Sequence, residues 1–169
     1  MGDLPVTDTN TQTIREAVGL FQDRPAFEAA VHHLLGAGFN APDLSVLDSH
    51  ESLAAAEPPG QPWRDVLTAL VGEIKYEGPL VASGAILLAG GPTAALIASL
   101  IGAATAGLAA KEVLDEVTAA PHTENFANAL AAGGVILWIA CADENAETRA
   151  LHILADFSAA NVHMYERTR

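Results

Sequence analysis

Hydrophobic and polar positions near the start of the chain predict a strand, a helix and a second strand. Residues 17–21 form a short apolar run of the kind found in buried strands. Asp23 is a favourable N-cap for the helix that begins behind it. Gly38 is expected to end this helix in the left-handed conformation, and residues 44–48 are expected to form the second strand. The apolar side chains of the helix recur at helical spacing, at Phe27, Ala30, Val31, Leu34 and Leu35.

The end of the chain repeats this order. Residues 135–141 are strongly apolar and predict a strand, and Asp143 follows as a second N-cap. Residues 162–165 alternate and predict a short final strand. The two strand–helix–strand halves predict an α+β, ferredoxin-like antiparallel sheet with both helices on one face. The second helix carries one apolar stripe, at Ala146, Ala150, Leu151, Leu154 and Phe157.

An uncharged, Ala/Gly-rich segment separates the two halves. Residues 78–110 contain no charged side chain, and a Gly-Gly-Pro sequence at 90–92 divides them. We expect an inserted helical hairpin, made of a short segment at 80–89 and a longer one at 93–110.

Other signals complete the expected organisation. Residues 49–62 contain several prolines and predict a loop, the apolar spacing in 63–76 predicts an amphipathic helix, and Pro121 can start a further helix. The expected parts are a flexible N-terminal arm at 1–13, a first βαβ half at 14–50, a helical insertion at 51–132 and a second βαβ half at 133–169.

The longer uncharged segment needs a partner that shields it from water. As a helix it is about 27 Å long, against a bilayer core of about 30 Å. Most of its side chains are Ala, Gly, Ser and Thr, which gain little from lipid. Small residues recur every fourth position, in rows that let helix backbones approach closely. We expect this segment to be buried against another helix, either its own hairpin partner or a second copy in a homo-oligomer, and membrane contact is the alternative. The expected interface residues are Leu96, Ala98, Ser99, Leu100, Ile101, Gly102, Ala103, Ala106 and Gly107.

Composition restricts the partners and the compartment. The net charge of −13 repels phosphate backbones and anionic headgroups, so nucleic acid is not expected as a partner. Cys141 is the only cysteine, which excludes an intrachain disulfide and a cysteine cluster for a metal. The first residues lack the pattern of a signal peptide. The expected localisation is cytoplasmic, with peripheral contact at the inner membrane as the alternative.

Residues with catalytic potential form no recognisable constellation. His32, His33 and His152 fall off the apolar stripes and are expected on the solvent side. Cys141 has no base beside it in sequence and is expected to be a small buried hydrophobe, with thiolate chemistry near the next helix as the alternative. The glycines at 90–92 fit a helix turn as well as an anion-binding nest. No catalytic, cofactor-binding or metal-binding residue is therefore assigned, and no cofactor is expected.

The sequence resembles a known bacterial family at both ends. VGLFQDRPAFEAAVHHLLGAGFNAPDLSVL resembles the opening of a general-stress-protein domain family, the heat-induced YflT-like group. HTENFANALAAGGVILWIAC resembles the helix and strand that precede the second βαβ half in that family. The resemblance covers residues 17–165 and implies a stress-associated protein without an assigned enzyme activity. The proline-rich loop at 49–62 departs from the family because it is longer.

Three functions are open at this point. The first is a non-enzymatic stress-associated interaction protein that self-associates through the Gly/Ala-rich insertion. The second is a peripheral membrane protein whose hairpin inserts reversibly. The third is a small-ligand-binding module or enzyme that uses the open face of the sheet near Trp138 and Cys141.

Overall fold

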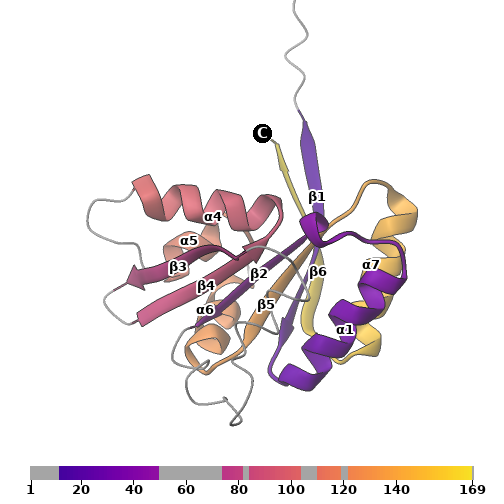
Figure 1. Cartoon of the computed structure of the whole chain (residues 1–169), viewed down its shortest axis with the longest axis horizontal. Helices are drawn as coiled ribbons and strands as arrows, with labels where there is room; N and C mark the ends of the chain where they lie inside the picture. The colour runs from indigo at the N-terminus through magenta and orange to yellow at the C-terminus, as the bar shows by residue number, and fades with distance from the viewer. Residues whose placement is uncertain (1–11, 50–73, 82–83, 104–109, 119–121, 169) are drawn as a thin grey trace, which may run out of the picture.

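The computed structural model describes residues 12–49, 74–81, 84–103, 110–118 and 122–168. These residues form an α+β domain with a six-stranded sheet in the order β3-β4-β2-β5-β1-β6, and every neighbouring pair is antiparallel (Figure 1). The strands are β1 (Thr13–Phe21), β2 (Leu44–Ser49), β3 (Ile74–Val81), β4 (Gly84–Gly90), β5 (Val135–Ala140) and β6 (Ala160–Thr168).

Helices cover both faces of the sheet. The helices α1 (Arg24–Gly36) and α7 (Glu144–Asp156) lie side by side on one face (Figure 1). The helices α4 (Pro92–Ala103), α5 (Ala110–Asp115) and α6 (Thr123–Ala131) pack on the other. A short 3-10 turn, Ala41–Asp43, leads into β2. The sheet is therefore the middle layer of three.

The face under α1 and α7 takes alternate side chains of the central strands. Ala17 and Phe21 of β1 join Leu137 of β5 there, and Phe27 and Leu34 of α1 pack on them, all buried. The rings of Phe21 and Phe27 meet edge to face at 5.7 Å. This core is what the stripes and strand runs of the two halves predict.

The opposite face has a second core. Val18 and Trp138 point to this side, where Ile97 of α4 and Phe126 of α6 cover them. The indole Nε1–H of Trp138 donates to the carbonyl of Val117 at 2.8 Å, which ties β5 to the segment between α5 and α6. The open sheet face expected near Trp138 is thus covered, and Trp138 is fully buried.

The two predicted N-caps and the predicted left-handed glycine are confirmed. A carboxylate oxygen of Asp23 accepts from the amide of Ala26 at 3.2 Å, and one of Asp143 accepts from the amide of Ala146 at 2.7 Å. Gly38 has φ +99° directly after α1. Local hydrogen bonding therefore fixes where both helices begin.

The terminal strands are longer than the apolar runs predict. β1 begins at Thr13 rather than at residue 17, so the last residue of the expected N-terminal arm at 1–13 belongs to this strand. β6 spans Ala160–Thr168 rather than 162–165. The two strands pair with each other from Thr13 and Thr168 onward. Backbone pairing extends both strands through positions where polar side chains dilute the hydrophobic pattern.

The expected helices of the insertion are partly wrong. Ile74–Val81 is strand β3, whereas 63–76 was expected to be a helix that ends before Gly78; residues 63–73 lie outside the described residues. The segment 80–89, expected to be helical, ends β3 and forms most of β4. A short apolar run does not distinguish a helix from a strand. Here the free edge of β2 pairs with β4, which a local pattern does not reveal.

The helical prediction holds further along the insertion. α4 begins at Pro92 and α6 at Thr123, close to the expected starts. The expected segment 93–110 is helical as far as Ala103 and again from Ala110, and residues 104–109 lie outside the described residues. Gly91 makes the turn from β4 into α4, where its amide donates to the carbonyl of Leu44 at 2.7 Å. A Cβ at Gly91 would lie 2.3 Å from the carbonyl oxygen of Pro42, so the close approach requires glycine.

Candidate functional site

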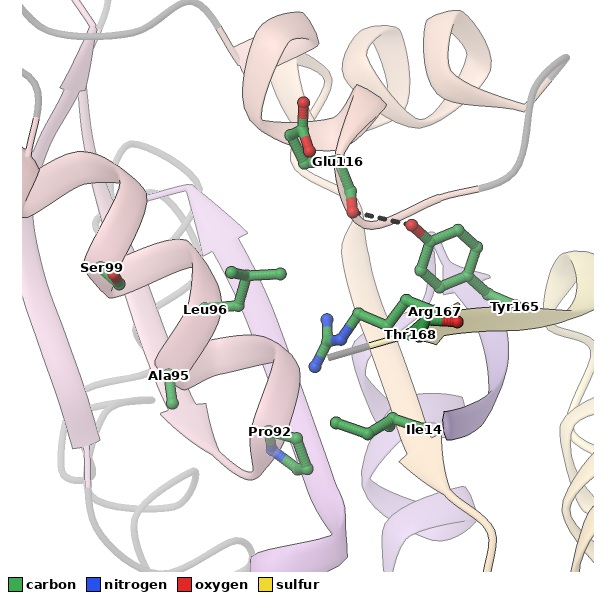
Figure 2. A pocket seen from close by; sticks show the side chains of 9 residues that line it. All are labelled: Ile14, Pro92, Ala95, Leu96, Ser99, Glu116, Tyr165, Arg167 and Thr168. Carbon is green, nitrogen blue, oxygen red and sulfur yellow. Dashed lines mark hydrogen bonds between the residues drawn. The ribbon is translucent and has the colours of Figure 1, made fainter. Parts of the chain in front are cut away.

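A pocket of about 420 Å³ opens between the start of α4 and the ends of β1 and β6 (Figure 2). Its wall combines aliphatic side chains with hydroxyl groups, the guanidinium of Arg167 and the acidic residue Glu116. The lining residues are Ile14, Pro92, Ala95, Leu96, Ser99, Glu116, Tyr165, Arg167 and Thr168.

A buried ionic cluster lies beside this pocket. The Glu16 side chain is 0% exposed, and the hydroxyl of Thr93 donates to its Oε2 at 2.5 Å. Nη1 of Arg167 donates to the Thr93 hydroxyl oxygen at 3.0 Å and lies 3.9 Å from Glu16 Oε2. The hydrogen bonds thus run in one direction, from Arg167 through Thr93 to Glu16. Within the described part of the chain, Glu16 Oε1 has no hydrogen-bond partner.

Strand register and helix placement bring these three residues together. Glu16 lies on β1 opposite Tyr165 of β6, and Ile14 lies opposite Arg167, so their side chains share the sheet face under α4. The turn after β4 places Thr93 in the first turn of α4, above β1. Thr93, which lies 77 positions after Glu16 and 74 before Arg167, therefore joins the two in one cluster.

Burial sets the electrostatics of the cluster. It raises the pKa of Glu16, while the Thr93 hydrogen bond and the Arg167 charge lower that pKa in part. Burial also raises the pKa of Tyr165, whose hydroxyl donates to the carbonyl of Glu116 at 2.8 Å. The Arg167 side chain is 14% exposed, and its guanidinium lies among Ile14, Pro92 and Leu96 in Figure 2. The pocket therefore presents one cation at an apolar wall.

A second pocket, of about 360 Å³, lies where α1 ends and α7 begins. It is lined among others by Phe39, Cys141, Asp143 and Arg149. Asp143 caps α7, and the Arg149 guanidinium lies 5.6 Å from the Phe39 ring centre. The Cys141 thiol donates to the Ile139 carbonyl at 3.3 Å. The buried charged cluster lies at the first pocket, which is therefore the stronger candidate.

Cys141 has the environment of a structural thiol. It is half-buried, and burial is the main cause that raises its pKa to about 11. The expected placement of Cys141 and Trp138 on one open face is wrong. Cys141 packs on the α1/α7 side, whereas Trp138 is buried on the other.

The histidines divide into exposed and stacked residues. His32, His33 and His152 are exposed, as expected from helical spacing. His163 and His122 stack with ring centres 4.4 Å apart, and burial lowers the pKa of His163. His50 lies outside the described residues. No group of three or more His, Cys, Asp or Glu side chains that could hold a metal ion occurs in the part of the chain that the structure describes.

The expected interface residues lie only partly within the described side chains. Ser99 is exposed on α4, and Leu96 and Leu100 are half-buried. Ala98, Ile101, Gly102 and Ala103 belong to α4, but their side chains are outside the description, as are residues Ala106 and Gly107 altogether. Two of the expected residues, Leu96 and Ser99, line the pocket. Among the described helices, none is long and apolar enough to cross a membrane.

The candidate anion nest at residues 90–92 is occupied by the fold itself. The amide of Gly91 donates to the carbonyl of Leu44, and the hydroxyl of Thr93 donates to the carboxylate of Glu16. These donors are therefore not free to bind an anion at the turn.

Glu16 and Arg167 were not singled out from the sequence. A weak signal for Glu16 exists, because it shares the alternation of Val18 and Leu20 on the strand and so falls on a buried face. The sequence carries no comparable signal for Arg167, which stands in a polar C-terminal segment. Comparison with family models, curated proteins and solved structures gives no match for this chain, so a functional assignment depends on the geometry of the pocket and its cluster.

Proposed function

We propose that the chain is a non-enzymatic binding domain that holds a small molecule in the pocket between α4, β1 and β6. The observation that carries the proposal is the Glu16–Thr93–Arg167 cluster beside that pocket. Mixed apolar and polar walls with a few convergent polar groups are the usual composition of small-molecule sites. The volume of about 420 Å³ lies within the range of such sites.

The energetic cost of the cluster supports a role in binding. Placing a carboxyl group in a fully buried position costs desolvation energy, and one oxygen of Glu16 gains no hydrogen bond in return. Apolar residues of similar volume at buried ion pairs are often neutral or stabilising. A buried charged cluster of this kind, next to a pocket, is typical of a functional site.

We also propose a ferredoxin-like arrangement for the four strands of the two halves. They lie in the order β2-β5-β1-β6, and α1 and α7 pack on one face. This order supports the assignment because each half contributes one inner and one outer strand around the β5–β1 pair. In this arrangement, the insertion adds β3 and β4 at one edge and supplies α4, which walls the pocket.

Saturation-transfer NMR with a mixture of small acids, amines, alcohols and aromatic compounds tests the proposed binding. Ile14→Trp places a large ring in the pocket, and Thr13→Trp places the same ring at the exposed neighbouring position of β1. We expect at least one compound to bind the wild-type chain and the Thr13→Trp variant but not Ile14→Trp. Binding that survives in Ile14→Trp, or the absence of any bound compound, would contradict the proposal.

Self-association through α4 is a second candidate function, favoured by the uncharged outer surface of that helix. Ala95 and Ser99 are exposed one turn apart, and Leu100 is half-buried beside them. Small residues at this spacing allow a second helix to approach closely. In this candidate the chain is a stress-associated interaction protein, as its sequence resemblance implies.

Light scattering after size exclusion tests the second candidate separately from the first. Leu100 does not line the pocket, so Leu100→Arg charges the outer surface of α4 and leaves the pocket wall in place. Leu151→Arg on α7 is the matched control, because Leu151 is also a half-buried leucine on a helix. Self-association predicts a wild-type mass above 17.5 kDa that falls to 17.5 kDa in Leu100→Arg alone. A wild-type monomer at micromolar concentration would eliminate this candidate.

A further inference from the structure

We propose that the pocket binds a small organic monoanion, with its anionic head on Arg167 and a short apolar body against Ile14, Pro92 and Leu96 (Figure 2). This inference rests on the proposed function and adds the chemical class of the ligand. It follows from the donors left on Arg167, from the charges that face it and from the apolar wall.

Arg167 has donors to spare for a ligand. A guanidinium carries five N–H groups, and within the described residues only Nη1 has a hydrogen-bond acceptor, the Thr93 hydroxyl oxygen. The planar fork of the remaining groups matches the two oxygens of a carboxylate. The terminal nitrogens lie at the pocket in Figure 2, and the side chain keeps 14% of its surface exposed.

The residues that the structure describes neutralise the charge of Arg167 only in part. Glu16 Oε2 lies 3.9 Å from Nη1, beyond hydrogen-bond distance, and burial favours the uncharged form of this carboxyl group. The Glu116 carboxylate is directed away from the guanidinium in Figure 2. A bound anion can therefore supply the negative charge that would balance the Arg167 guanidinium.

The pocket walls limit the ligand to one charge and a short apolar body. Among the residues that the structure describes, Arg167 is the only cationic side chain that lines the pocket. A second negative charge on the ligand would lie near Tyr165 and Glu116. The tyrosine hydroxyl there already donates its hydrogen bond to the Glu116 carbonyl, so it is not free to bind that charge. Ile14, Pro92 and Leu96 offer carbon surface beside the guanidinium, which suits a hydrocarbon chain. An amine of the same length would place a cation against Arg167.

Isothermal titration with three matched six-carbon probes tests the ligand class. Hexanoate, 1-hexanol and hexylamine differ only in the head group. For a probe of about eight non-hydrogen atoms we expect a Kd of about 1 mM for hexanoate. The alcohol should bind at least about tenfold more weakly because it lacks the charge that pairs with Arg167. The amine should show no binding.

Variants locate the anionic head. Arg167→Gln should weaken hexanoate binding at least about tenfold, and Arg167→Lys, which keeps the charge, should retain part of it. Arg149→Gln in the second pocket is the matched control and should leave the Kd unchanged. Thermal unfolding of each variant shows whether it is folded. If Arg167→Gln does not fold, the Kd of hexanoate for Arg167→Lys is compared with that for wild type instead.

The outcomes separate this inference from the proposed function. If 1-hexanol or hexylamine binds as well as hexanoate, and Ile14→Trp abolishes that binding, the pocket binds small molecules but the ligand class is wrong. If hexanoate binds equally to wild type and to both Arg167 variants, the head group is not on Arg167 and the inference fails. If no probe binds but other compounds bind in the Ile14-dependent way, the inference fails and the proposed function stands.

Discussion

Removal of the Arg167 charge tests how the buried Glu16 carboxyl is stabilised. Arg167→Met keeps most of the side-chain volume and removes both the hydrogen bond to Thr93 and the attraction to Glu16. Glu16→Leu/Arg167→Met removes both charges and leaves an apolar contact in their place. The two variants separate the cost of an unpaired buried group from the value of the pair.

The geometry places the expected loss below that of a tight ion pair. Breaking a fully buried pair costs about 3–5 kcal/mol. Here the two charged groups are 3.9 Å apart and Arg167 is partly exposed, so the attraction that is lost is weaker than in a tight, fully buried pair. We therefore expect Arg167→Met to lower the free energy of unfolding by about 2 kcal/mol. The double variant should lie within about 1 kcal/mol of wild type or above it.

Urea unfolding followed by circular dichroism near neutral pH measures these differences. The coupling energy between positions 16 and 167 should be about 2 kcal/mol in a double-mutant cycle. Effects that add within about 0.5 kcal/mol would refute the reasoning, because they would mean that the two groups do not interact. Glu16→Leu alone completes the cycle.

Three further changes test the rest of the fold. Trp138→Phe leaves the Val117 carbonyl without its donor and should lower stability by about 2 kcal/mol in urea unfolding; no loss would mean that this contact does not hold α5 and α6 on the sheet. Gly91→Ala places a methyl group against the Pro42 carbonyl and should cost about 2 kcal/mol or more in the same assay, whereas a neutral effect would contradict the close approach. Burial lowers the pKa of His163, so the unfolded chain takes up its proton first as the pH falls below the usual value of 6.5. The stability of wild type relative to His163→Phe should therefore fall below this pH and stay constant above it; urea midpoints across the pH range check the sign.

The two βαβ halves could be predicted because their signals are local. Asp23 and Asp143 cap helices through hydrogen bonds to residues three positions away, and one turn of sequence is enough to reveal them. The apolar stripes repeat over whole helices, so α1 and α7 are well defined by period alone. The ends of β1 and β6 are predicted less accurately, because the pairing of these two strands extends through polar positions.

The β3–β4 pair could not be predicted because its cause is distant. The segment 80–89 is short, apolar and uncharged, and this pattern fits a buried helix and a buried strand equally. The decision comes from the edge of β2, which offers unpaired backbone groups that β4 satisfies. Gly91 then turns the chain so sharply that α4 returns over the sheet.

The candidate site was missed for a related reason. Glu16 and Arg167 are unremarkable when read singly, one at the start of an apolar run and the other near the end of the chain. Their chemistry arises from strand register, which sets them on one face, and from α4, which brings Thr93 between them. The sequence pattern pointed to the uncharged helix, and the structure places the pocket beside the first turns of that helix, α4.

An NMR titration of isotope-labelled protein with hexanoate tests the central claim most directly. The account predicts saturable shifts at the Arg167 Nε–H group and at the amides of Ile14 and Leu96, with Arg149 and Phe39 unmoved. Shifts centred on the second pocket, or none at the Arg167 side chain, would contradict it.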